Sequence, residues 1–228
     1  MIAHYEKNPD TVGWLYMKNT VIDEAVVKVN YNDNNEYYLR RTSLGEPSTG
    51  DYSVGWYGCY FADWRCTVGA RSLLSKNTVI YGHSMTDNVN AGEDYQKKFT
   101  ELKRYLDIDF AKNNPYIYFS TPQSDMIWQI FAVFYTKTDF AYNTPDPSNA
   151  DFLSIITEAR KKSIYNYDID VGISDNILTL STCCYNYDGK SLGYPNDYRF
   201  VVMAKLLPAD AALAETVTVE ANPSIMKP

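Results

Sequence analysis

The sequence contains no long apolar run. No stretch approaches the roughly 18 to 20 consecutive apolar residues that a membrane-spanning helix needs. The first ten residues, MIAHYEKNPD, also lack the charged-then-apolar pattern of a signal peptide. The chain as given is therefore expected to be soluble, with any export or anchor segment lying outside it.

An excess of positive charge is also absent. Lysine and arginine together number 21, against 28 aspartate and glutamate residues, which gives a net charge of −7. Polyanions bind to basic surfaces, so this balance argues against a nucleic-acid partner and favours a neutral or basic one.

Cysteine is scarce. The chain has four, Cys59, Cys66, Cys183 and Cys184, and none belongs to a C-x-x-C pair. This excludes a disulfide scaffold and the common zinc and thioredoxin patterns. Adjacent Cys183 and Cys184 could pair with each other only through a strained ring. Cys59 and Cys66 either form a disulfide, if a turn brings them together, or fill two small core positions.

Aromatic residues, in contrast, are abundant, with 21 Tyr and 9 Phe among 228 residues. This composition favours a β-rich fold, and the length suits a single domain. We expect amphipathic helices at 93–106 and 151–163. Residues 1–207 are expected to form the domain and 208–228 a mobile tail. The expected strands are 12–17, 25–29, 54–61, 77–81, 115–120, 126–136, 176–183 and 198–207.

The strand that ends in the two adjacent cysteines differs between its two faces. Alternation of side chains gives an apolar face that includes Cys184 and a small, polar face that includes Ser181 and Cys183. Cys184 is therefore expected in the core. Cys183 is expected at the strand end, where a substrate can lie.

A nucleophilic cysteine needs a nearby base or cation, because a thiol with the ordinary pKa of about 8.5 is mostly protonated at neutral pH. The chain has two histidines. His4 lies in a polar N-terminal stretch, whereas His83 follows a strand, and Gly82 permits a sharp exit from that strand. His83 is the expected partner of Cys183.

Acyl transfer also needs a donor for the oxyanion. Arg199 begins the strand after Cys183, and an antiparallel pairing of these two strands would bring the side chains together. Asp63, Asp188 and Asp197 are open candidates for an orienting carboxylate, and each is otherwise a turn or surface residue.

Three motifs, in this order, carry a family resemblance: YGH ending at His83, TLSTC ending at Cys183, and YRFVV beginning at Tyr198. Together they resemble the signatures of the sortases, the cysteine transpeptidases of Gram-positive bacterial surfaces. The stretches NPDTVGWLYM, NNEYYL and KNNPYIYFSTP, with the helix before the Cys strand, resemble class B sortases in particular. The resemblance spans about Asn8 to Leu207, and Ser84 departs from it where Asn is expected.

The resemblance implies a mainly β fold: a closed eight-stranded sortase-type β-barrel with N-terminal helical decoration and a helix inserted before the Cys strand. It implies that Cys183 attacks a Thr carbonyl in a C-terminal sorting signal and forms a thioester. His83 would be the general acid and later the base, and Arg199 the clamp for oxyanion and substrate. The substrate-binding residues would be Ser181, Thr182, Asn35, Leu39 and Tyr142.

The implied partners are the sorting-signal peptide of secreted surface proteins and an amine of the peptidoglycan precursor, with no metal or organic cofactor. The implied location is the extracellular face of the bacterial cell membrane, with an N-terminal anchor in the native form. Two alternatives stay open. One is a pilin-polymerising sortase that uses a protein Lys as nucleophile, and the other is a non-catalytic β-barrel that binds peptides and buries Cys183.

Overall fold

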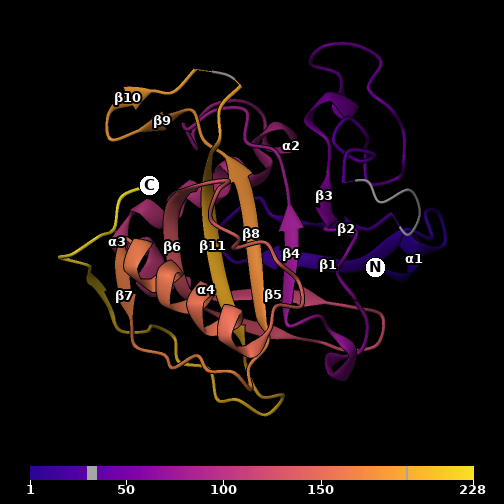
Figure 1. Ribbon diagram of the computed structural model, residues 1–228. Helices are drawn as coiled ribbons and strands as arrows, with labels where there is room; N and C mark the ends of the chain where they lie inside the picture. Colours follow the sequence, from indigo (N-terminus) through magenta and orange to yellow (C-terminus); the bar gives the residue numbers. More distant parts are fainter. Residues whose placement is uncertain (30–34, 194) are drawn as a thin grey trace.

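The computed structural model describes residues 1–29, 35–193 and 195–228. Its centre is a closed barrel of eight strands, in the order β1-β2-β3-β4-β8-β11-β6-β5, with β5 paired to β1 (Figure 1). The mainly β, eight-stranded fold predicted from the sequence is confirmed. The barrel strands are β1 (Thr11–Met17), β2 (Asp23–Val27), β3 (Tyr60–Ala62), β4 (Asn77–Tyr81), β5 (Tyr116–Ser120), β6 (Ile127–Lys137), β8 (Ile177–Cys183) and β11 (Tyr198–Leu206).

One predicted strand is shorter than expected. Residues Val54–Tyr57 form a 3-10 helix, η1, and only Tyr60–Ala62 joins the barrel. Gly58 ends η1 with a φ of 60°, and a Cβ there would lie 2.7 Å from the Leu39 carbonyl oxygen. Glycine is needed at this position because the chain both adopts a left-handed conformation and approaches another backbone closely.

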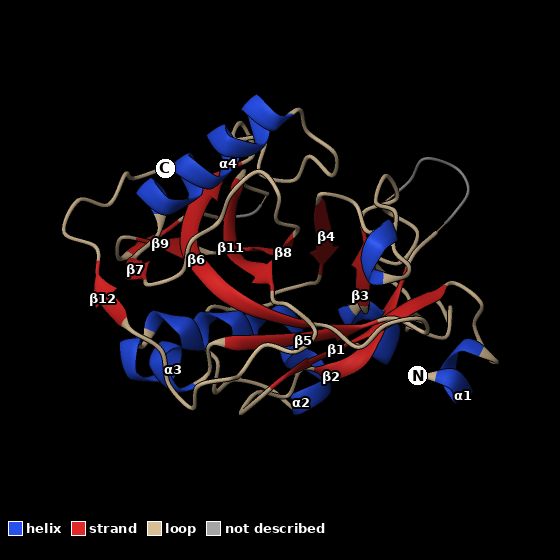
Figure 2. Ribbon diagram, turned by 90° about the horizontal axis from the view of Figure 1, so that it is seen from below, coloured by secondary structure: helices blue, strands red, loops and turns tan. Residues whose placement is uncertain are grey.

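The helices lie on two sides of the barrel (Figure 2). On one side is α4 (Asn149–Lys162), the helix inserted before β8, which agrees with the predicted 151–163. The Ser148 side chain accepts a hydrogen bond from Asp151 N and so caps its N-terminus. Helix α4 packs Phe152 and Ile156 into an apolar cluster with Phe131 and Phe134 of β6. On the opposite side are α2 (Asp94–Lys97) and α3 (Ile108–Asn113).

The helix predicted at 93–106 is divided. Its first turn is α2, and a 3-10 helix, η3 (Lys98–Leu106), follows directly. The break falls at Lys98, whose φ is 41°. Phe99 N donates to the His83 carbonyl oxygen instead of continuing the α-helical ladder. Tyr105 enters the core, whereas Tyr95 and Leu106, which share one face of a continuous α-helix with Phe99 and Leu102, are exposed.

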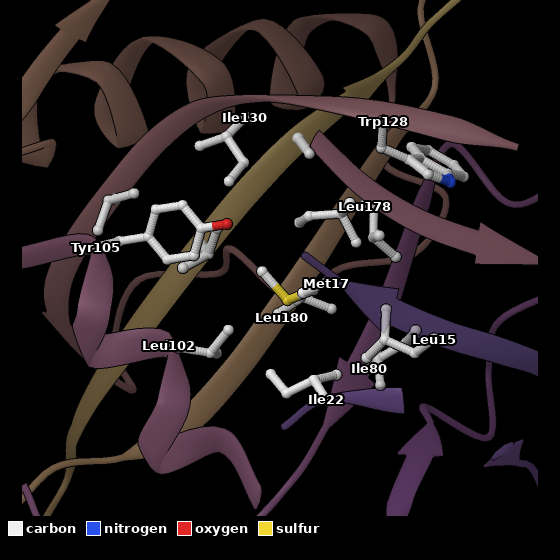
Figure 3. Packing of buried hydrophobic residues seen from close by; sticks show 14 of the residues in the cluster. Leu15, Met17, Ile22, Ile80, Leu102, Tyr105, Trp128, Ile130, Leu178 and Leu180 are labelled. Carbon is white, nitrogen blue, oxygen red and sulfur yellow. The ribbon is translucent and has the colours of Figure 1, made fainter. Parts of the chain in front are cut away.

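The core fills the barrel interior. In Figure 3, Leu102 and Tyr105 of η3 point into the same interior as Met17 and Leu180. Burying one such side chain stabilises the fold by about 1.5 to 3 kcal/mol. Helix η3 is thus anchored by its own apolar residues inside the barrel.

The segment after Pro208 follows the protein surface. Val219–Ala221 forms β12, which pairs antiparallel with β7 (Tyr165–Tyr167) and buries Val219. Met226 N donates to the Lys161 carbonyl oxygen. The mobility expected from its composition stays a prediction, while β7 supplies this segment with a strand partner that the local sequence does not reveal.

The remaining elements are short. They are α1 (Ile2–Tyr5) at the N-terminus, η2 (Arg71–Leu73), and a hairpin of β9 (Asn186–Tyr187) and β10 (Lys190–Ser191) between β8 and β11. The hairpin extends from the barrel end at which β4 and β8 terminate (Figure 1). The candidate residues lie at this same end.

Candidate active site

Cys183 ends strand β8 and Cys184 follows it, and the two side chains lie on opposite sides of the sheet, as the alternation predicts. Cys184 is fully buried in the barrel core with Leu180, whereas Cys183 is half-buried at the end of the strand. Burial raises the pKa of the Cys184 thiol to about 12. The Cys184 thiol is therefore protonated at neutral pH and packs in the core. Cys183 is the thiol that a substrate can reach.

Strand β11 brings an arginine to Cys183. The two strands are antiparallel neighbours, and Arg199 is the direct cross-strand partner of Cys183. Side chains of directly opposed residues project to the same face of a sheet. The guanidinium donates to the carbonyl oxygens of Asn196, at 3.1 Å, and Tyr198, at 2.8 Å. These bonds hold it at the beginning of the strand.

Strand β4 brings the histidine from the other side of β8. The two strands are parallel, with Tyr81 opposite Ser181, and Gly82 N donates to the Ser181 carbonyl oxygen at 3.4 Å. His83 is the next residue. A Cβ on Gly82 would lie 2.8 Å from the rings of Tyr60 and Phe99, so the close packing of these rings against the main chain requires glycine.

The His83 ring is oriented by a main-chain carbonyl group. Its Nε2 lies 2.7 Å from the Leu39 carbonyl oxygen. A carbonyl oxygen only accepts, so Nε2 carries the hydrogen, and in the neutral ring Nδ1 is the basic nitrogen. Burial lowers the pKa of His83, and the bond to Leu39 opposes this shift without reversing it. The imidazole is therefore mostly neutral at neutral pH.

A cavity of about 280 Å³, called the groove below, gathers the residues expected to be catalytic or substrate-binding, whereas the candidate carboxylates Asp63, Asp188 and Asp197 do not line it. It lies between the ends of β4, β8 and β11 and the loops that face them. Its lining includes Cys183, His83, Arg199, Ser181, Thr182, Asn35, Leu39 and Tyr142.

Some of these residues shape the groove wall through bonds to one another. The Tyr142 hydroxyl and Ser181 Oγ form a buried hydrogen bond of 2.8 Å. Thr182 Oγ1 donates to the Gly82 carbonyl oxygen at 2.7 Å and so ties β8 to the residue before His83. Leu39 contributes its main-chain carbonyl group, which orients the His83 ring, and no side-chain pattern could indicate this role.

Asp63 organises the opposite wall of the groove. This carboxylate is fully buried and accepts hydrogen bonds from Arg65, the Tyr81 hydroxyl and Asn35 Nδ2. Burial alone would raise the pKa of Asp63, but the bonds from Arg65 and Tyr81 outweigh it and lower the pKa. Asp63 was a candidate for orienting the histidine. The structure uses it to fix Tyr81 and Asn35, which both line the groove.

The chain matches the sortase domain family over residues 70–207. The chain belongs to the sortase family. It is 34% identical to Sortase B of Listeria monocytogenes over 77% of this chain and 63% of that protein, and 28% identical to Sortase B of Staphylococcus aureus over 88% of this chain and 71% of that protein. It therefore spans slightly less than two thirds of the Listeria protein.

Solved sortase structures share the fold. The Staphylococcus aureus sortase B-substrate complex superposes with a TM-score of 0.73 and 26% identity, over 92% of this chain and 85% of that one. These relatives confirm the resemblance to class B sortases that the motifs indicated.

A second cavity, of about 800 Å³, lies beside the groove in this sortase. It shares Leu39, His83, Cys183 and Arg199 with the groove and extends to Trp56 of η1. The candidate nucleophile and base thus border both adjoining cavities.

Cys59 and Cys66, which come before and after β3 in the sequence, are buried free thiols. The disulfide left open for Cys59 and Cys66 is therefore wrong, and both are core residues. Burial raises the pKa of Cys66 to about 12, although Val79 N donates to its sulfur.

Proposed function

We propose that this sortase is a cysteine transpeptidase that cleaves a C-terminal sorting signal after Thr and transfers the surface protein to an amine of the peptidoglycan precursor. The observation that carries the proposal is the meeting of Cys183, His83 and Arg199 at one groove, on three adjacent strands. A binding module would have no need of a half-exposed thiol between an imidazole and a guanidinium.

The reactive form arises when the Cys183 thiol gives its proton to Nδ1 of His83, which makes a thiolate and an imidazolium. In the first step this thiolate adds to the Thr carbonyl carbon, and the carbonyl oxygen takes the negative charge. Arg199 stabilises this oxyanion, because a guanidinium offers several fixed donors. His83 gives a proton to the leaving amine as the C–N bond breaks, which leaves a thioester on Cys183.

In the second step an amine attacks the thioester carbonyl carbon. Neutral His83 removes a proton from this amine, and the C–S bond breaks to restore the thiolate. We assign the groove to the sorting peptide, with Ser181, Thr182, Asn35, Leu39 and Tyr142 at its wall, and the second cavity to the acceptor amine.

The proposal includes a domain assignment and a location. Residues 1–207 are the catalytic domain, and the protein acts at the extracellular face of the bacterial cell membrane, held there by an N-terminal anchor in its native form. No helix within the described residues has the length and apolar character to cross a bilayer.

The test is intact-protein mass spectrometry of the wild type, Cys183→Ala and Cys184→Ala after mixing with a panel of Thr-containing sorting peptides. We expect peptide cleavage and an acyl adduct in the wild type and in Cys184→Ala, and neither in Cys183→Ala. Addition of a peptidoglycan stem-peptide amine should discharge the adduct, whereas discharge only by a Lys-containing pilin peptide would support the pilin-polymerising alternative. Peptide binding without cleavage by any variant would favour the binding module.

A further inference from the structure

A buried ion pair lies directly behind the candidate residues. Lys103 of η3 has a side chain that is 1% exposed, and its Nζ lies 2.7 Å from Asp87 Oδ1, whose side chain is 17% exposed. Taking two charges out of water costs free energy that their attraction often fails to repay. Such a pair therefore calls for an explanation beyond stability.

The Lys103 ammonium group reaches both candidate segments. Its Nζ donates to Ser84 Oγ at 2.8 Å, and Ser84 is the residue after His83. The same Nζ lies 3.4 Å from the carbonyl oxygen of Cys183. One charged group thus contacts the chain beside the base and the main chain of the nucleophile.

Asp87 holds the same two segments from its own side. It belongs to the loop that carries His83, and its Oδ2 accepts from Tyr185 N at 2.9 Å and from Asn186 Nδ2 at 3.0 Å. These donors come immediately after the two cysteines. The pair therefore links residues 83–87 to residues 183–186, which are about a hundred positions apart in the sequence.

Helix η3 gives this link a rigid base. Leu102 and Tyr105, on either side of Lys103, are buried in the barrel interior (Figure 3). Phe99 N, one turn earlier, donates to the His83 carbonyl oxygen at 2.8 Å. A side chain between such neighbours has little freedom to move, so η3 can fix the position of both segments at once.

We propose that Lys103, paired with Asp87, is a positioning residue that holds the His83 loop and the Cys183 strand end at their reactive separation. The inference rests on the proposed function and deepens it. Neither residue lines the groove, so both act through the segments that carry His83 and Cys183. It also accounts for Ser84, the departure from the family pattern, as the acceptor that ties the ammonium group to the His83 loop.

The groups around the ammonium are few. Asp87 supplies its counter-charge, the Phe200 ring lies 5.9 Å away, and the Cys184 thiol is buried nearby. Burial lowers the pKa of Lys103, and Asp87 opposes this shift. The ammonium lies 3.4 Å from the Cys183 carbonyl oxygen, so its loss should also disfavour the Cys183 thiolate.

The experiment uses Lys103→Met, Asp87→Asn and, as a matched control, Lys205→Met. Lys205 forms an ion pair with Asp175 that is 3.0 Å long and more exposed than that of Lys103, and it lies at the end of the β8–β11 pair opposite to Cys183. Two measurements are made on each folded variant: kcat and KM for a sorting peptide that the wild type cleaves, and the pH profile of Cys183 alkylation by iodoacetamide.

We expect Lys103→Met to lower kcat by about 10- to 100-fold with little change in KM, since a misplacement of about 1 Å costs a reaction on this scale. Its alkylation profile should move to higher pH. Asp87→Asn, which keeps the shape of the side chain, should lower kcat less. Lys205→Met should lose stability alone and keep the wild-type kcat and profile.

The proposal is overturned if folded Lys103→Met has the wild-type kcat and alkylation profile, or if Lys205→Met changes both equally. Should Lys103→Met fail to fold, Asp87→Asn with unchanged kcat and profile overturns it as well. The alkylation measurement needs no peptide. If the wild type cleaves nothing, the proposed function fails, and a shifted profile in Lys103→Met still supports the positioning role.

Discussion

Arg199 and Cys183 are directly opposite each other in the antiparallel pair of β11 and β8. Because the register of a barrel strand is fixed along its whole length, this neighbour relation does not depend on loop conformation. It also means that the guanidinium and the thiol project to one face of the sheet, toward the groove.

Replacing Arg199 tests its role as the oxyanion donor. Arg199→Gln should lower kcat/KM for a cleaved peptide by about 10²- to 10³-fold, as the loss of one such donor does in other acyl-transfer enzymes. Arg199→Lys should recover only part of this loss, because an ammonium keeps the charge but not the fork of donors. Arg71→Gln, which removes an arginine bonded to the Leu207 carbonyl oxygen at the other end of the barrel, serves as the control. Wild-type kcat/KM in Arg199→Gln would exclude the role.

The four cysteines should differ sharply in reactivity. Iodoacetamide should label the folded protein once, at Cys183, because Cys59, Cys66 and Cys184 are buried and burial raises the pKa of each. Peptide mapping after a short exposure locates the label. Cys183→Ala should abolish labelling and Cys184→Ala should leave it unchanged, whereas a second label in the folded wild type would contradict the burial of the other three.

The β-rich character of the fold and the meeting of the three candidate residues could be predicted from the residues themselves, whereas the closed barrel was an implication of the family resemblance. Each strand has local signals, and the alternation along β8 alone separates Cys183 from Cys184. The proximity of Arg199 to Cys183 followed once the two strands were assumed to be antiparallel neighbours, and the structure adds their register. These features depend on short-range pattern and on the geometry common to all sheets.

Other features depend on contacts that no local pattern encodes. The bond from His83 to the Leu39 carbonyl oxygen involves a main-chain group, so the identity of residue 39 carries no signal. The break after Lys98 arises because Phe99 N bonds to His83 O across the fold, against a sequence that suits one continuous helix. Asp63 was recognised as a candidate, but two of the groups it binds, the Tyr81 hydroxyl and Asn35 Nδ2, come from residues 18 and 28 positions away in the sequence.

Stability should depend on pH through His83. The unfolded chain takes up a proton on this residue near its ordinary pKa of 6.5, whereas burial makes the folded protein do so only at lower pH. Between these two values the unfolded state binds more protons, so the free energy of unfolding falls as the pH falls below about 6.5. His83→Gln should reduce this decline, as measured by urea unfolding at pH 7.5 and pH 5.5.

The pKa of His4 is lowered too, chiefly by burial, so His4→Gln should reduce the same decline. The double variant should be the flattest of the four proteins between these two pH values. Asp63 does not interfere, because its lowered pKa places its own contribution below about pH 3.8. If the free energy of unfolding of His83→Gln falls with pH as steeply as that of the wild type, the pKa of His83 is the same in the folded and the unfolded protein.

The C-terminal segment should contribute to stability through β12. Val219 is 2% exposed in the main core cluster, beside Tyr165 and Tyr167 of β7. Val219→Ala removes two buried methyl groups and should lower the free energy of unfolding by about 1 to 2 kcal/mol. Glu220→Ala, at the exposed neighbouring position, should change it by less than about 0.5 kcal/mol. Equal effects of the two changes in urea unfolding would mean that the segment is mobile, as its composition suggests, because only a docked strand can distinguish its buried residue from its exposed one.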